Sequence, residues 1–228
     1  MHALQVDARD LLPHEAHRLS HSCSHTGEQD VPDRPPWIYT ACGDYRTLIE
    51  TVMHADPAIR RADVPVPRND LIRRWQALAA DAESPDHFEL DQFGELILSP
   101  KPTTGHQRVA SAIAWELRNQ LGGEAVTEVS VLTDRGIRVP DVVWMPAERW
   151  AACKAQSPLE VVPDVCIEVL SPSNTRQEIE MKIGAYLRGG AREVIVVGLK
   201  GEIEIFGSQG KRATSALGIA LALPPELF

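Results

Sequence analysis

One charged residue inside an apolar run constrains the fold of this chain more than any other feature. The segment PDVCIEVLSP has the length and composition of a central strand buried on both faces, and Glu168 lies within it. A carboxylate on a core strand carries a large desolvation cost unless another group pairs with it. The chain must therefore fold so that a partner reaches Glu168.

Two other polar residues accompany apolar segments and are candidates for that role. Asp141 follows Pro140 at the start of VPDVVWMP, and Lys182 lies on the helix expected after the Glu168 strand. If the two strands are neighbours, Asp141 and Glu168 would repel each other, and a divalent cation would keep both ionised. Mg²⁺ needs only one or two protein carboxylates, because water and a substrate phosphate complete its shell. The pattern predicts a Mg²⁺ or Mn²⁺ site held by Asp141 and Glu168.

Lys182 is expected beside the apolar stripe of its helix, where its amine can point back at the sheet. There it could orient an attacking water or neutralise charge that develops on a phosphate. Simpler interpretations remain open at this point. Glu168 and Lys182 could form a buried ion pair without metal, and Asp141 could cap a turn or pair with Arg138.

The charge balance limits the partners that the chain can have. Its 228 residues carry a formal net charge of -9, and 43% of them are hydrophobic. That length allows one sizeable domain with an extension. Nonspecific binding of nucleic acid through bulk positive charge is excluded, so any contact has to be local and assisted by metal. This acidity is the main evidence in the composition against a DNA substrate.

The cellular compartment is predicted from three kinds of pattern, namely those of disulfides, signal peptides and membrane helices. The four cysteines show no CxxC spacing, and no disulfide framework is expected. The N-terminus does not have the basic and apolar regions of a signal peptide. No apolar run approaches the ~20 residues of a membrane helix. We therefore expect a cytoplasmic protein with no membrane contact.

The chain divides near residue 67. Residues 1–67 are rich in His, Pro, Asp and Arg and contain no lysine, and we expect an N-terminal extension that is largely disordered or linker. The spacing within its cluster of possible ligands fits no recognised zinc site; these residues are His14, His17, His21, Cys23 and His25. Residues 68–228 are predicted to form one mixed α/β domain.

Hydrophobic periodicity predicts the elements of that domain. Thr104 and Gln107 are expected to form a capping box on the first long helix, and residues 147–160 are expected to form a loop. The predicted elements, in order, are a helix over 71–82, a hairpin over 88–98 that turns at Gly94, a helix over 106–121, strands over 126–134, 137–145 and 163–170, a helix over 175–190 that Thr175 and Glu178 cap, and strands over 193–199 and 202–206.

The order of a PD pair, a glutamate in an apolar strand and a nearby lysine resembles the PD-(D/E)XK nucleases. In their usual form the lysine stands two residues after the glutamate, but that position here is Leu170. Lys182 on the following helix takes its place, as in some branches of the superfamily. A closer similarity, from Phe88 to the C-terminus, is to the Uma-two family of restriction-endonuclease-like proteins, which are mostly bacterial. It rests on five segments in the same order, FELDQFGELILSP, GHQR, RVPDVVWMP, PDVCIEVLSPSN and EMKIGAYLRGGAREVIVV.

The resemblance implies a restriction-endonuclease-like mixed sheet flanked by helices, a poorly ordered N-terminal extension, and a Mg²⁺- or Mn²⁺-dependent endonuclease that acts on DNA. Asp141 and Glu168 would bind the metal, and Lys182 would assist the attack of water. His106, at a helix start, could bind substrate phosphate with free helix amides, or simply cap or pack the helix. Glu95, at the hairpin end, could add an acidic group, or be a solvated charge. The family also makes a homodimer possible.

Two rival functions remain open. One is a catalytically silent module for binding or dimerisation, which Leu170 and the acidic surface favour. The other is a metal-dependent hydrolase of small phosphoesters, which the net charge of -9 favours. A basic rim at the mouth of the site, formed by Lys101, Arg108 and Arg138, would count against the second rival.

Overall fold

The computed structural model describes residues 64–228 except residue 154. The predicted extension over 1–67 therefore lies, up to residue 63, outside the described residues. The elements are α2 (Arg68–Ala80), β1 (Phe88–Leu90), β2 (Leu96–Leu98), α3 (Thr104–Leu121), β3 (Glu124–Thr127), β4 (Val131–Thr133), β5 (Gly136–Arg138), β6 (Val142–Met145), α4 (Ala147–Cys153), β7 (Val165–Val169), α5 (Arg176–Arg188), β8 (Glu193–Val197), β9 (Ile203–Gly207), β10 (Gly210–Arg212) and a 3-10 turn (Pro225–Leu227).

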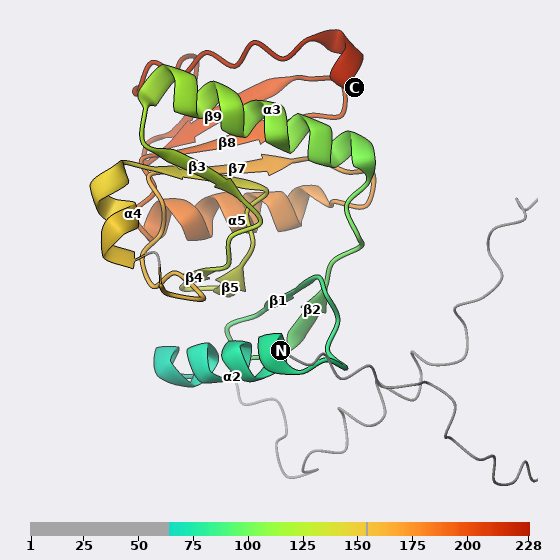
Figure 1. Ribbon diagram of the computed structural model, residues 1–228, viewed down its shortest axis with the longest axis vertical. Helices are drawn as coiled ribbons and strands as arrows, with labels where there is room; N and C mark the ends of the chain where they lie inside the picture. Colours follow the sequence, from blue (N-terminus) through green and yellow to red (C-terminus); the bar gives the residue numbers. More distant parts are fainter. Residues whose placement is uncertain (1–63, 154) are drawn as a thin grey trace, which may run out of the picture. The chain divides into compact units, whose positions relative to one another are not determined.

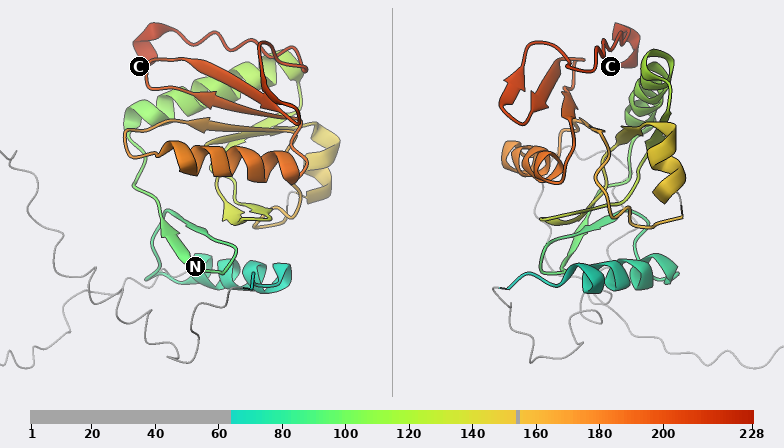
Figure 2. Two further views of the ribbon diagram at one scale, coloured as in Figure 1. Left: turned by 180° about the vertical axis from the view of Figure 1, so that it is seen from behind. Right: turned by 90° about the vertical axis from the view of Figure 1, so that its left-hand side faces the viewer.

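A six-stranded mixed sheet with a helix on each face forms the centre of the fold (Figure 1; Figure 2). Its strand order is β10-β9-β8-β7-β6-β3. β7 and β8 are parallel, and the other neighbours are antiparallel. The right-hand view of Figure 2 shows α3 and α5 on opposite sides of this sheet. The predicted mixed α/β class and the restriction-endonuclease-like arrangement are confirmed.

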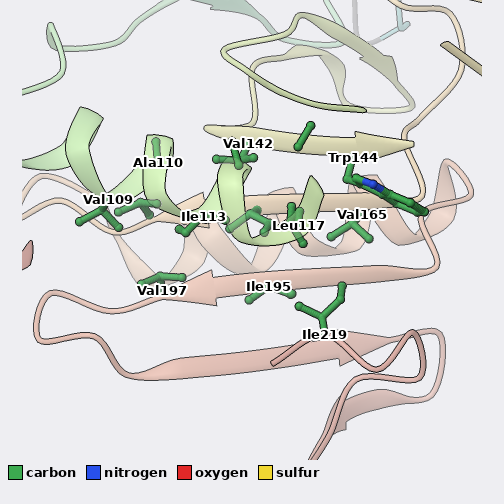
Figure 3. Packing of buried hydrophobic residues seen from close by; sticks show 14 residues of the cluster. Val109, Ala110, Ile113, Leu117, Val142, Trp144, Val165, Ile195, Val197 and Ile219 are labelled. Atoms are coloured by element: carbon green, nitrogen blue, oxygen red, sulfur yellow. The ribbon is translucent and has the colours of Figure 1, made fainter. Parts of the chain in front are cut away.

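The predicted apolar stripe of α3 forms the core on one face of the sheet. Val109, Ile113 and Leu117 are buried and pack against sheet residues such as Val165 and Ile195 (Figure 3). The spacing of four residues places these side chains on one side of the helix. Their burial holds the beginning of α3 over the end of β7, where the predicted site lies.

β7 is buried along its whole length and presents alternate side chains to the two helices. Val165, Ile167 and Val169 belong to the core under α3. Cys166 belongs to the core under α5, and Glu168 faces the same helix because side chains alternate along a strand. The predicted central strand with a charged residue inside it is confirmed.

A second sheet, with the order β2-β1-β5-β4, packs on α2. The predicted hairpin over 88–98 is confirmed, because β1 and β2 pair antiparallel and Gly94 turns between them with a φ of 75°. Trp75 of α2 contacts Phe88 of β1 at a ring-centroid distance of 4.5 Å. This small sheet carries the hairpin that forms one side of the site.

Two predictions of long strands were wrong in the same way. The segments 126–134 and 137–145 are each broken, and their halves belong to different sheets. The first break is at Glu128, whose φ of 54° lies far from extended geometry. The second is at Pro140, which has no N–H for a strand ladder. The alternating sequence continues across both breaks, so periodicity alone could not locate them.

The second break changes the position of Asp141. It was expected within the strand over 137–145, but it lies between β5 and β6, in neither strand. The N–H of Glu128 donates to the carbonyl oxygen of Asp141 at 3.2 Å, so the two breaks are adjacent. Asp141 is thereby carried to the end of β7 instead of lying along a strand.

Two local predictions also needed correction. Residues 147–160 are not a loop throughout, since α4 begins them and buries Trp150 and Cys153, which are three residues apart. The cap of α3 is Thr103 instead of Thr104, because its hydroxyl accepts from the N–H of His106. The Thr175 part of the predicted cap of α5 is confirmed, since its hydroxyl accepts from the N–H of Glu178. Among the described residues, no helix is long and apolar enough to cross a membrane.

Candidate active site

A cleft of about 1300 Å³ lies between the hairpin and the end of β7. It is lined from α2, the β1–β2 hairpin, the beginning of α3, α5 and the turn after β8. The structure brings four of the five predicted site residues to it, namely Asp141, Glu168, Lys182 and His106. These side chains come from different elements, so the site exists only in the folded chain.

Glu168 is 4% exposed, and α5 supplies both of its side-chain partners. The Lys182 amine lies 3.3 Å from Oε2. The Tyr186 hydroxyl donates to Oε1 at 2.7 Å. Lys182 and Tyr186 are four residues apart and therefore share a face of the helix. The partner that the sequence requires for Glu168 is thus present, and it forms the buried ion pair with Lys182 that the simpler interpretation described.

Burial raises the pKa of the Glu168 carboxyl to about 7, although the Lys182 charge opposes it. The negative charges of Asp141 and Glu89 act in the same direction as burial, and the Tyr186 hydroxyl acts against it. Near neutral pH this carboxyl therefore exchanges a proton easily. A cation placed beside it would favour the ionised form.

Lys182 lies between two buried carboxylates. Its amine is 2.9 Å from Oε1 of Glu89 and 3.3 Å from Oε2 of Glu168. Burial by itself would lower the pKa of Lys182, but the two carboxylates outweigh it and raise the pKa above its usual value. Lys182 is consequently a positive charge and a hydrogen-bond donor at neutral pH, and it is not a base.

Glu89, in the middle of β1, was missed by the sequence analysis. It is buried, and it accepts from the Arg138 guanidinium at 2.9 Å and from the N–H of Val139 at 2.9 Å. Burial would raise the pKa of Glu89, but Lys182 and Arg138 together lower it. Its sequence signal is the same as that of Glu168, an acidic residue between apolar ones, but a strand of three residues is too short to stand out.

Asp141 reaches the backbone at the end of β7. Its Oδ2 accepts from the N–H of Val169 at 2.6 Å and lies 3.4 Å from Nε2 of His106. The same His106 nitrogen is 3.1 Å from the carbonyl oxygen of Val169. The hydrogen bond to Asp141 raises the pKa of His106, while burial opposes it. The alternative pairing of Asp141 with Arg138 is not formed, because Arg138 is buried against Glu89.

Asp141 and Glu168 are the acidic side chains of the site that would hold a metal ion. Within the described ranges no three His, Cys, Asp or Glu side chains form a metal-binding group. Asp141 and Glu168 offer carboxylate oxygens, which Mg²⁺ and Mn²⁺ prefer, and one or two such groups suffice when water and phosphate complete the shell. In the part of the chain that the structure describes, no hydrogen bond to Oδ1 of Asp141 is found. The pair fits a hard divalent cation.

The remaining candidate, Glu95, is not among the residues that line the cleft. It follows the hairpin turn and is exposed, and its N–H donates to the Asp91 side chain at 2.8 Å. The hairpin does bring an acidic side chain to the site, but that residue is Glu89. The role of His106 toward substrate phosphate stays a prediction, since its ring contacts Asp141 in this structure.

The contrast between these two glutamates can be measured. Glu89→Gln removes the charge that balances Lys182 and Arg138 in the core, and we expect a loss of about 2–4 kcal/mol in the free energy of unfolding. Glu95→Gln, at an exposed position, should change it by less than about 0.5 kcal/mol. Urea denaturation of both variants checks this, and equal losses would contradict the assignment.

Similarity to known proteins identifies the family of this chain. No curated protein matches the chain. A solved structure that resembles it is described as "a putative nuclease belonging to DUF820 from Anabaena variabilis ATCC 29413", with 20% sequence identity, a TM-score of 0.44, and coverage of 61% of this chain and 87% of that chain. Residues 72–223 match the Uma2 family, described as "Putative restriction endonuclease". That match spans most of the described chain, and the protein belongs to the Uma2 family.

Proposed function

We propose that this protein is a Mg²⁺- or Mn²⁺-dependent endonuclease that hydrolyses phosphodiester bonds in DNA. Membership of a family described as restriction endonucleases supports nuclease activity and a nucleic-acid substrate. The observation that carries the finer proposal is the cluster at the end of β7. There Asp141 and Glu168 face one cleft, and a lysine with a raised pKa contacts Glu168.

Asp141 and Glu168 would hold the ion. Once bound, it would stabilise charge on the scissile phosphate and lower the pKa of a bound water. Asp141 is already oriented for this by the Val169 N–H and by His106. Glu168 is oriented by Tyr186, whose hydroxyl fixes Oε1. Both carboxylates are thus held in place by neighbours before any ligand arrives.

Lys182 would act through its charge and its N–H groups. Since its pKa is raised, it stays protonated at the pH at which Glu168 ionises. A fixed ammonium group can orient an attacking water and stabilise negative charge that develops on the phosphate oxygens. Glu89 would keep Lys182 in position, and the Arg138 partner of Glu89 keeps that carboxylate ionised.

Two observations favour the rival functions, the silent binding module and the hydrolase of small phosphoesters. Leu170 occupies the usual place of the lysine, and Lys182 is already paired with two carboxylates, which suits a silent binding module. The basic rim that would argue against a hydrolase of small phosphoesters is limited to Lys101. Arg138 is buried, and Arg108 does not line the cleft.

Cleavage by an Asp141→Asn variant tests the proposal. We expect the wild-type chain to cut DNA in Mg²⁺ or Mn²⁺, and the variant to be slower by about 10²–10³-fold, because it loses one carboxylate of the pair but keeps the side-chain shape. Asp134→Asn, at a half-exposed ion pair with Arg188, is the matched control and should cut at the wild-type rate.

The outcomes separate the three functions. A folded Asp141→Asn protein with wild-type cleavage would refute the assigned site. If the wild-type chain left DNA intact but hydrolysed bis(p-nitrophenyl) phosphate in Mn²⁺, it would be a hydrolase of small phosphoesters. Inactivity toward both substrates, with the fold intact by circular dichroism, would identify the silent module.

The raised pKa of Glu168 predicts how metal binding depends on pH. Only the ionised carboxyl binds a cation, so Mn²⁺ affinity should rise as the pH passes about 7 and then level off. Tyr186→Phe keeps the ring in the core but removes the hydrogen bond to the ionised form. The pKa of Glu168 should then rise further, and the increase in affinity should move to higher pH.

Calorimetric titration of both proteins with Mn²⁺ between about pH 6 and about pH 8.5 covers this range. An affinity that does not vary with pH in the wild-type protein would contradict the role of Glu168. An identical pH profile for Tyr186→Phe would contradict the role of the Tyr186 hydroxyl.

A further inference from the structure

The cleft is acidic at its mouth as well as at its centre. No arginine occurs among the described residues that line it. Two lysines do, and Lys182 is buried between two carboxylates, whereas Lys101 lies at the surface of the cleft. The ionisable Asp, Glu and Lys side chains of the lining are seven carboxylates and two lysines, Asp81, Asp86, Glu89, Glu128, Asp141, Glu168, Glu178, Lys101 and Lys182.

This distribution is poorly suited to a double helix. Duplex DNA carries about one negative charge per 1.7 Å, and proteins bind it mainly by neutralising successive phosphates with lysine and arginine. Bound divalent ions would offset charge only beside Asp141 and Glu168. The exposed Asp81, Asp86 and Glu128 would still repel the flanking phosphates of both strands.

The same cleft has exposed apolar side chains on both of its sides. Leu98, at the end of β2, is 50% exposed and belongs to the small sheet. Leu199, in the turn after β8, is 54% exposed, and Phe228 is 42% exposed. All three line the cleft. Large apolar side chains at these positions can pack against the faces of unpaired bases, which a duplex hides inside its stack.

The volume of the cleft favours a strand of nucleic acid over a small molecule as the ligand. Pockets for small ligands usually measure about 300–1000 Å³. At about 1300 Å³ this cleft is larger than such a pocket. Its openness to both apolar sides allows bases on either side of the reacting phosphate to make contact.

From the charge, the apolar sides and the volume together, we infer that the cleft binds single-stranded nucleic acid, with unpaired bases packed against Leu98 and Leu199. One phosphate would lie at Asp141 and Glu168, and that last point rests on the proposed nuclease function. Recognition would come chiefly from bases, and phosphate contacts beyond the reacting one would be few.

Fluorescence anisotropy with the full chain tests this without requiring cleavage. Ca²⁺ replaces Mg²⁺, and the probes are a labelled single strand of about twelve nucleotides and a duplex of the same sequence. We expect the single strand to bind at least about tenfold more tightly. The logarithm of its binding constant should fall only slowly with the logarithm of the salt concentration. We expect a slope near -1 to -1.5, since each neutralised phosphate adds about -0.7.

Substitutions on the two sides of the cleft complete the test. Leu98→Ser and Leu199→Ser should each weaken single-strand binding by about three- to tenfold, because each removes an apolar surface under a base. Trp115→Ser is the control, as Trp115 is 58% exposed on α3 and does not line the cleft. Its binding should equal that of the wild-type chain.

Tighter or equal binding of the duplex, undetectable binding of the single strand, a salt slope of about -4 or steeper, or wild-type binding by both leucine variants would each overturn the inference. Other outcomes would refute the proposed nuclease function without refuting the inference about single strands. Single-strand binding that depends on the leucines, without cleavage in Mg²⁺, would keep the inference and refute the proposed function. Cleavage in Mg²⁺ together with tighter binding of the duplex would keep the proposed nuclease function and refute the inference about single strands.

Discussion

The buried contact between Glu168 and Lys182 is the interaction on which the rest of this structure depends. A carboxylate in the centre of a sheet requires a partner, and α5 provides the ammonium group and the Tyr186 hydroxyl from one face. Lys182 requires a second carboxylate in turn, and Glu89 supplies it from the small sheet. The chain of contacts continues to Arg138 and joins the two sheets. The groups that form the candidate site therefore also set how the two sheets meet.

This dual role explains why the site is preorganised. Every charged member of the cluster is held by at least one other element, so removal of one takes away a partner from an opposite charge that stays buried. Asp141 is the more accessible carboxylate of the pair, since its side chain is 20% exposed and that of Glu168 is 6% exposed. A cation and a phosphate can approach from the Asp141 side without displacing core residues.

The sequence was sufficient to predict the parts of the site that follow from local pattern. A charge in an apolar run identified Glu168, and helical spacing placed Lys182 beside it. Glu89 was not found because it lies in a strand of three residues, and Tyr186 was not found because its spacing is that of an ordinary core position. Asp141 lines the cleft, but it was expected on a strand, since an alternating pattern does not reveal the break at Pro140. The features that the sequence did not predict depend on contacts between elements that lie far apart in the chain.

In the proposed mechanism, Asp141 and Glu168 share one cation. A crystal structure of the protein grown with Mn²⁺, with data collected at the manganese absorption edge, tests it directly. We expect an anomalous peak about 2.0–2.3 Å from a carboxylate oxygen of each residue. A fully occupied manganese site elsewhere, or no peak at all while Glu168 remains bonded to Lys182 and Tyr186, would contradict it.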